Sequence, residues 1–332
     1  MLIAVILLIL SAAAIYLSCE FFVNGVEWVG HRFGVSQTAT GTVLAAFGTA
    51  LPESVVTFVA VVFGHSAAQK EIGVGAALGG PLVLSTIAYA VVGAVFLTMQ
   101  HSGAERRVVS RPARKRLVND QKWFMVIFVC KIALGLVAFA IKPWLGILFL
   151  LAYGAYVWHE MTADGEQSDA ETLEPLKIRP RDASPSTAWA VLQTVGALVA
   201  IFLSSQLFVK QIEAIGPWLG MAPQLVALLL SPIATELPET LNAVIWVRQG
   251  KSDLALANIS GAMMIQATVP SALGIMFTPW MLDHSLIWAG VVTMMSVAGL
   301  SLFLRRRHLS ARKLTAFGGL YGVFAAGLFF LK

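Results

Sequence analysis

The chain alternates long apolar runs with short polar connections. Ten of these runs, each of about 18 to 28 residues, could cross the hydrocarbon core of a bilayer as a helix, which rises about 1.5 Å per residue. They cover residues 2–29, 37–64, 72–99, 123–141, 143–160, 187–212, 222–247, 254–278, 284–304 and 314–331. The pattern therefore predicts ten transmembrane helices.

Composition agrees with this prediction. Hydrophobic residues make up 58% and charged residues 12% of the 332 residues, against about 45–50% and about 25% in soluble domains. The mean hydropathy is +0.78. These values indicate a membrane protein with many crossings.

The basic residues gather on alternate connections. The connections after the odd-numbered helices hold most of the 23 Lys and Arg residues, with dense groups at 106–122, 177–181 and 305–313. Such an excess is typical of cytoplasmic loops. We therefore expect a multi-pass protein of the plasma membrane with both termini extracytoplasmic, and the net charge of +5 needs no nucleic-acid partner.

A short sequence occurs twice, in the second and seventh apolar runs. It reads Gly-Thr-Ala-Leu-Pro-Glu at 48–53 and Ala-Thr-Glu-Leu-Pro-Glu at 234–239, which is 186 residues later. Other identities at this offset, such as Gly64 with Gly250, extend the repeat over about five helices. Because five is odd, the second copy must cross the membrane in the opposite direction, and inverted repeats place their substrate site where the copies meet.

We therefore expect an all-α transmembrane fold of ten helices in two inverted-topology repeats of five. The first repeat covers residues 1–160 and the second covers residues 187–332. Residues 161–186 are rich in acidic residues, Pro, Ser and Thr, which predicts a solvated cytoplasmic linker.

Each copy of the repeated sequence places a carboxylate and a proline inside an apolar run. A carboxylate at mid-bilayer costs about 2.5–3.5 kcal/mol and needs a proton, a partner or a bound cation. Pro52 and Pro238 cannot donate to the carbonyls four residues earlier, so both helices should be kinked or broken there. Freed carbonyls at this depth need a polar cavity or another partner.

The resulting oxygen groups are candidate cation ligands. They are the carboxylates of Glu53 and Glu239, the hydroxyls of Thr49 and Thr235, and the carbonyls of Gly48 and Ala234. Such a set approaches the six to eight oxygens that Ca²⁺ takes. In the alternative interpretation the prolines only kink packed helices, and the glutamates stay protonated as hydrogen-bond donors between helices.

These residues resemble the signature of the sodium/calcium exchanger, or cation/calcium antiporter, superfamily. Members carry Gly-Thr-Ser-Leu-Pro-Glu in each half, followed by Gly-Asn-x-x-Gly-Ser-Asn on the next helix. The resemblance implies a sodium/calcium exchanger-like fold and exchange of calcium against sodium or protons by alternating access. It makes Glu53 and Glu239 the principal ligands, supported by Thr49 and Thr235.

The chain departs from this signature at several positions. Asn258 is kept, and Gln266 stands where members often have an acidic or amide residue, but the third helix loses every polar ligand and has Leu84 at the position equivalent to Gln266. Since sodium sites of the family use those lost groups, strict three-sodium coupling is in doubt. Glu236 is a gain, and if the local turn is helical it lies beside Glu239. We hypothesise a cluster of Glu53, Glu236 and Glu239 that binds a divalent cation and exchanges protons, because close carboxylates titrate as a coupled set.

Other polar residues in the apolar runs are ambiguous. Helix faces carry Glu20, Asn24 and Glu27 in the first run, and Gln206, Lys210 and Glu213 at equivalent positions in the sixth. These residues either line the ion pathway, with Glu20 as the best candidate, or reach the membrane interface, with Lys210 paired to Glu213. Lys131 either extends its ammonium group to the membrane interface, pairs with another residue or has a functional role.

We expect a secondary antiporter whose partners are inorganic cations and the lipid bilayer, with no cofactor and no enzymatic activity. No phosphate-binding loop and no zinc-protease pattern is found in the sequence. The alternatives are a proton-coupled antiporter of manganese or sodium, a cation channel, an intramembrane enzyme that uses two carboxylates, and a transport-inactive scaffold.

Overall fold

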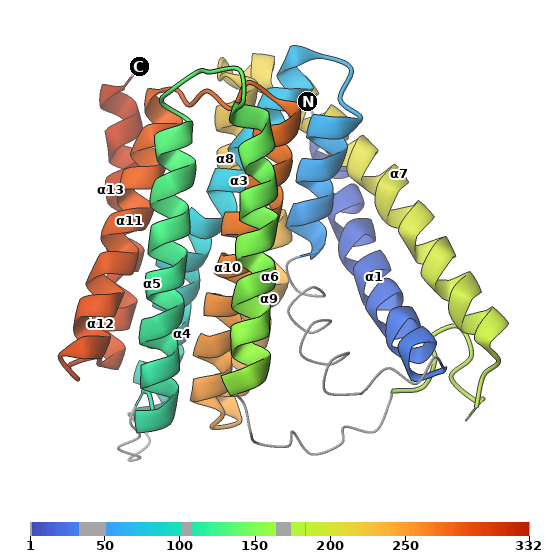
Figure 1. Ribbon diagram of the computed structural model, residues 1–332, viewed down its shortest axis with the longest axis horizontal. Coiled ribbons are helices and arrows are strands. Elements are labelled where there is room, and N and C mark those ends of the chain that lie inside the picture. Colours follow the sequence, from blue (N-terminus) through green and yellow to red (C-terminus); the bar gives the residue numbers. More distant parts are fainter. Residues whose placement is uncertain (1, 33–50, 101–107, 164–173, 183, 332) are drawn as a thin grey trace.

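The structure, a computed structural model, describes residues 2–32, 51–100, 108–163, 174–182 and 184–331, and these contain helices but no strand (Figure 1). The first half contains α1 (Leu2–Arg32), a helix over Leu51–Val62, α3 (Ala67–Val83), the π-helix η1 (Leu84–Ala88), α4 (Tyr89–Gln100), α5 (Arg111–Leu134), the 3₁₀-helix η2 (Lys142–Leu145) and α6 (Gly146–Ala163). The second half contains α7 (Thr187–Leu219), α8 (Pro223–Thr235), α9 (Leu237–Arg248), α10 (Ser252–Phe277), α11 (His284–Arg305), α12 (Ala311–Ala316) and α13 (Gly318–Phe330).

These helices follow the ten apolar runs in order. Four runs consist of joined segments: α3, η1 and α4 form one, η2 and α6 the second, α8 and α9 the third, and α12 and α13 the last. Among the described helices, five are each long and apolar enough to cross a membrane by themselves. Of the other crossings, α5 begins with a basic segment, and the rest are shorter in the described residues or are interrupted.

The helices α1 and α7 lie side by side and lean away from the rest of the bundle, on the right of Figure 1. The two chain ends lie at the same end of the molecule (Figure 1), as an even number of crossings requires. Within the bundle, α3 packs against α8 at backbone distance. A Cβ atom on Gly79 would lie 2.6 Å from the Leu228 carbonyl oxygen, and glycine allows this approach. This contact brings the C-terminal part of α3 to the middle of α8.

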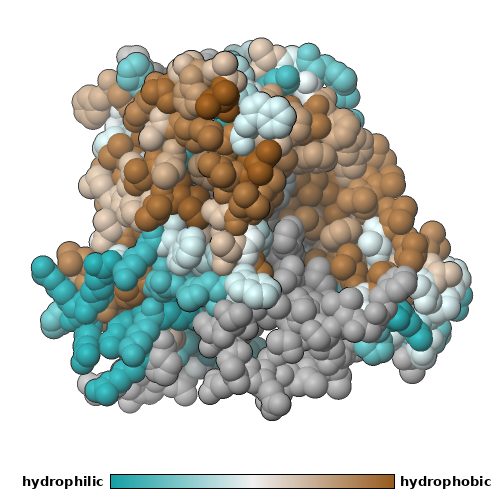
Figure 2. Space-filling model, viewed as in Figure 1, coloured by the Kyte–Doolittle hydropathy of each residue, from teal (hydrophilic) through white to brown (hydrophobic). Residues whose placement is uncertain are grey.

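The surface has the two-part character of a membrane protein. Hydrophobic side chains cover most of the upper part of the face in Figure 2, and hydrophilic side chains gather at the lower left. The exposed basic residues Lys115 and Arg116 at the start of α5, and Arg305, Arg306 and Arg307 at the end of α11, lie at one end of the bundle. Exposed apolar side chains such as Leu198, Val199 and Leu203 on α7 have lipid as their natural contact.

One local prediction differs from the structure. The fourth helix was placed at 123–141, but α5 runs from Arg111 to Leu134, and this prediction is wrong in its bounds. The Ser110 side chain caps the helix start by accepting from the Ala113 N–H, so the basic segment joins the helix, which ends at Leu134. The seventh helix breaks beside Pro238 as predicted, with Glu236 (φ −97°, ψ −4°) between α8 and α9.

Part of the linker is packed rather than solvated. Leu176 is fully buried against Trp28 and Ala190, and the Trp28 indole N–H donates to the Glu174 carbonyl at 2.9 Å. The Asn24 carboxamide oxygen accepts from the Lys177 N–H at 3.0 Å. Residues 174–182 therefore bind the paired helices α1 and α7, whereas the division of the chain at residues 160 and 187 stays a prediction.

Candidate cation site

The break between α8 and α9 collects the polar residues at the centre of the bundle. Thr235 ends α8, Glu236 occupies the break and Glu239 lies in the first turn of α9. Glu53 comes from the helix over Leu51–Val62, and Gln266 from the middle of α10. All five side chains are at most 3% exposed, although each is polar.

Four of these residues form one hydrogen-bonded group. The Thr235 hydroxyl lies 2.6 Å from Glu53 Oε2 and 3.0 Å from Glu236 Oε1. The Gln266 amide nitrogen donates to Glu236 Oε2 at 2.7 Å. The group therefore joins the two halves of the chain, Glu53 from the first and the other three from the second.

One hydrogen cannot satisfy all the oxygens around Thr235. Its hydroxyl also lies 3.1 Å from the Ser231 carbonyl oxygen, so it faces three acceptors with a single donor. The remaining close oxygen pairs need a proton on a carboxylate or a bound cation between them.

Around this group, four buried oxygen acceptors have no donor among the described residues. They are Glu53 Oε1, both carboxylate oxygens of Glu239, and Gln266 Oε1. Glu239 also lies close enough to Glu53 and Glu236 for the three carboxylates to interact electrostatically. Within the described residues, no three His, Cys, Asp or Glu side chains converge as a ready metal cluster, so the three carboxylates do not close on one point.

On the side of α3, a glycine faces the side chains of Gln266 and Glu236. A Cβ atom on Gly80 would lie 2.6 Å from Gln266 Oε1 and 3.1 Å from Glu236 Oε1. The third helix therefore presents bare backbone to these two side chains. This position agrees with the loss of polar ligands that the sequence shows on this helix.

The sodium/calcium exchanger protein family matches the chain over residues 3–162 and 189–330. The chain belongs to this family. It is therefore a multi-pass membrane exchanger of cations and not an enzyme, as the sequence predicts. The inner membrane protein YrbG of Escherichia coli K12 is 25% identical over 283 residues, which cover 85% of this chain and 82% of YrbG.

Two solved structures share the fold of this exchanger. The H⁺/Ca²⁺ exchanger CAX has a TM-score of 0.74 at 16% identity, covering 98% of this chain and 82% of CAX. The sodium-calcium exchanger NCX_Mj has a TM-score of 0.59 at 17% identity, covering 98% of this chain and 99% of NCX_Mj. The prediction of ten helices in two inverted repeats is confirmed by this likeness.

The remaining predicted ligands of the exchanger are placed less fully. Gly48 and Thr49 lie outside the described residues, and of Ala234 only its backbone, in the last turn of α8, is described. Asn258 lies two turns before Gln266 on α10, and its amide nitrogen has no hydrogen-bond partner among the described residues. Glu236 caps the start of α9, and the Thr240 N–H donates to its carbonyl at 3.1 Å, so Glu236 and Glu239 lie within one helical turn, as expected.

Two hydroxyl residues of the site were missed by the sequence reasoning. The Ser231 hydroxyl lies 3.4 Å from Glu53 Oε2, and Thr57, one turn after Glu53, has a fully buried hydroxyl for which the described residues provide no partner. Both follow helical spacing, since Ser231 precedes Thr235 by four residues and Thr57 follows Glu53 by four. This spacing from each signature residue was the available signal.

The weaker polar residues have other partners than those expected. Glu20 pairs with Lys177 of the linker at 3.0 Å. Glu213 accepts from the Ser66 hydroxyl and the Gln69 amide, both at 2.8 Å, while Lys210 is exposed. The predicted pairing of Lys210 with Glu213 is therefore wrong.

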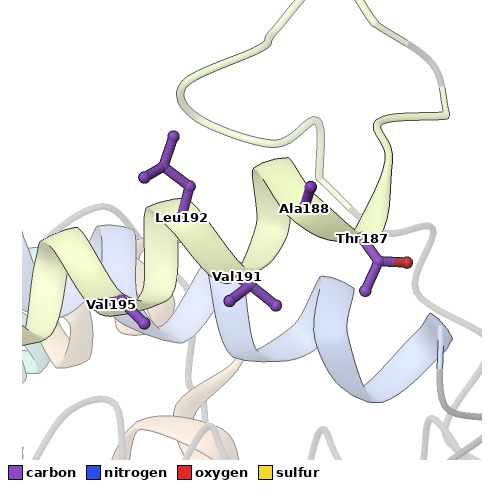
Figure 3. A pocket seen from close by; sticks show the side chains of 5 residues that line it. All are labelled: Thr187, Ala188, Val191, Leu192 and Val195. Carbon is purple, nitrogen blue, oxygen red and sulfur yellow. The ribbon is translucent and has the colours of Figure 1, made fainter.

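A hollow on the outer face of α7 is unrelated to these residues. Thr187, Ala188, Val191, Leu192 and Val195 line it (Figure 3), and all five are exposed. It offers one hydroxyl and no charge. Its apolar lining fits a lipid chain better than a cation.

Proposed function

We propose that this exchanger is a secondary active antiporter that moves Ca²⁺ in exchange for H⁺ through the buried carboxylate site. The observation that carries the proposal is the set of four buried oxygen acceptors on Glu53, Glu239 and Gln266 that have no donor in the part of the chain that the structure describes. Oxygen acceptors without donors are ligands for a hard cation, and a membrane interior supplies no water to satisfy them. The plasma membrane, with both termini outside the cytoplasm, is the proposed location.

The ligand inventory suits a divalent ion. Glu53, Glu236 and Glu239 supply carboxylates, Gln266 an amide oxygen, and Thr235 a hydroxyl. Carbonyls of Gly48 and Ala234 and the groups of Thr49 and Asn258 would complete the six to eight oxygens that Ca²⁺ takes. Because the three carboxylates do not yet converge, we propose that the site closes around the ion when it binds.

The bare backbone of α3 at Gly80 favours protons over sodium as the counter-ion. The side chains of Gln266 and Glu236 occupy the space where a side chain at position 80 would begin, so α3 supplies no side-chain ligand at this position. The pocket therefore offers fewer neutral oxygens to hold several sodium ions. Its carboxylates can instead take up protons when Ca²⁺ leaves.

The inverted repeat supports alternating access rather than a permanent pore. Glu53 and Glu239 come from equivalent positions in opposite repeats and meet at one buried place. Exposure of this place to either side requires relative movement of the two parts of the molecule. The paired helices α1 and α7, which lean away from the bundle, are the proposed moving part (Figure 1).

Uptake of radioactive calcium into inside-out vesicles tests this function. An imposed proton gradient should drive uphill Ca²⁺ accumulation, and a sodium gradient of the same size should drive less. Addition of Mn²⁺ as competitor measures whether manganese shares the site. Downhill flux without accumulation would identify a channel, and no flux would support a scaffold.

The variants Glu53→Gln and Glu239→Gln should each abolish accumulation, because each removes a charge from the site. Glu213→Gln is the matched control, since Glu213 is also a helical carboxylate but binds Ser66 and Gln69 on another face. Full accumulation in Glu53→Gln or Glu239→Gln vesicles would refute the site assignment.

A further inference from the structure

A buried lysine on α5 has no place in the site described so far. Lys131 is 0% exposed and lies eight residues after Trp123, where the apolar part of its helix begins. In the part of the chain that the structure describes, no carboxylate lies within ion-pair distance of it. An ionisable side chain inside a membrane helix is expensive and is commonly functional.

Its ammonium group is held by a backbone carbonyl of α3 and a side-chain hydroxyl of α10. Lys131 Nζ donates to the Ala77 carbonyl at 3.0 Å, and this carbonyl has lost its helical donor because Pro81 stands four residues later. Nζ also donates to the Ser271 hydroxyl at 3.1 Å. The face of the Phe128 ring lies 4.5 Å from Nζ, which favours a cation there.

Trp280 fixes the backbone of α5 at Lys131. The Trp280 indole N–H donates to the Lys131 carbonyl at 3.0 Å, and Trp280 is 0% exposed. Its ring packs against Gly274 of α10 so closely that a Cβ there would lie 2.2 Å from it. The lysine is thus a rigid part of the contact among α3, α5 and α10.

The same contact leads directly to the carboxylate site. The Ser271 hydroxyl also lies 3.4 Å from the Gln266 carbonyl, which Pro270 leaves without its helical donor. The Gln266 side chain continues to Glu236 at 2.7 Å. Lys131 also acts electrostatically on Glu53 across this region.

We propose that Lys131 is a built-in counter-charge of the cation site. Its ammonium group and the three carboxylates together then carry a net charge of minus two. With Glu53, Glu236 and Glu239 ionised, one divalent cation then neutralises the set. Without Lys131, one negative charge is left over and the site holds a divalent ion too tightly for efficient release. This inference rests on the proposed cation-transport function and adds a residue that limits affinity.

Calcium binding to purified full-length protein tests the proposal, with the variants Lys131→Met and Lys131→Gln. Both should raise the apparent affinity for Ca²⁺ at least about tenfold, since a nearby positive charge in a low dielectric weakens cation binding. Lys142→Met is the matched control, because Lys142 is 3% exposed and also donates to two carbonyls, those of Val137 and Trp280. It should leave the affinity within twofold of wild type.

The outcomes separate this inference from the proposed function. Suppose that the wild type binds Ca²⁺ and that folded Lys131→Met and Lys131→Gln proteins bind it with the same or weaker affinity. This result would overturn the counter-charge role of Lys131, but it would not contradict the calcium site. A purely structural role of Lys131 gives this result, with a lowered melting temperature. Absence of Ca²⁺ binding in wild type would overturn the proposed function and this inference together.

Discussion

Replacement of Gly80 by alanine perturbs the cation site without replacing any of its proposed ligands. The new Cβ would lie 2.6 Å from Gln266 Oε1, 2.9 Å from Gln266 Cδ and 3.1 Å from Glu236 Oε1. Gln266 is buried and cannot swing into free space, so it must give up its 2.7 Å hydrogen bond to Glu236. A hydrogen bond of this kind contributes about 1.5–3 kcal/mol, and overpacking costs about 1–3 kcal/mol.

Both effects act on the proposed ligands. We therefore expect Gly80→Ala to weaken apparent Ca²⁺ affinity about 10- to 100-fold, since about 1.4 kcal/mol corresponds to a factor of ten. Calcium-dependent transport in proteoliposomes measures the affinity, and thermal unfolding in detergent measures stability. Gly261→Ala on α10 is the control, because a Cβ there would meet nothing within 4 Å.

A double variant checks the cause. If the new methyl group acts through Gln266, Gly80→Ala should cost much less in a protein that already carries Gln266→Ala. Wild-type affinity in the single variant Gly80→Ala, or equal effects in both backgrounds, would refute the steric argument.

Three further substitutions have distinct expected results. Thr235→Ala should reduce calcium uptake at least about tenfold because it removes the hydroxyl between Glu53 and Glu236, and Thr235→Ser should restore most of it; equal loss in both variants would count against the hydroxyl. Trp280→Phe removes the indole donor to the Lys131 carbonyl and should lower stability by about 1–2 kcal/mol, which chemical or thermal unfolding measures. Glu20→Gln should keep transport and lose less than about 1 kcal/mol, because its pair with Lys177 is partly exposed; loss of uptake would instead place Glu20 in the ion pathway.

Much of the fold follows from the sequence because apolar run length and loop charge respond directly to the bilayer. The repeated Leu-Pro-Glu segment also indicated the inverted repeat and the helix break. The bounds of the fourth helix could not be predicted in this way, since the polar segment from Arg111 to Lys122 is helical only because it continues a buried helix and is capped by Ser110. The apolar run ends where the membrane ends, but the helix continues beyond it.

The site was predictable in its carboxylates but not in its contacts. Glu53 and Glu239 were visible as charges in apolar runs, but the hydrogen bond from Gln266 to Glu236 depends on how α10 packs beside the break. The position of Lys131 depends on the Ala77 carbonyl, which Pro81 frees on α3, and on the Ser271 hydroxyl of α10. Such partners are set by tertiary packing, which spacing along a single chain does not contain.

The central claim is that the unpartnered oxygens of Glu53 and Glu239 hold the transported cation. A crystal structure of the protein soaked in Ca²⁺, with anomalous scattering used to locate the ion, tests it most directly. We predict one peak in the pocket at about 2.3–2.6 Å from carboxylate oxygens of both Glu53 and Glu239. A pocket without a peak, while Ca²⁺ is bound elsewhere in the protein, would contradict the account.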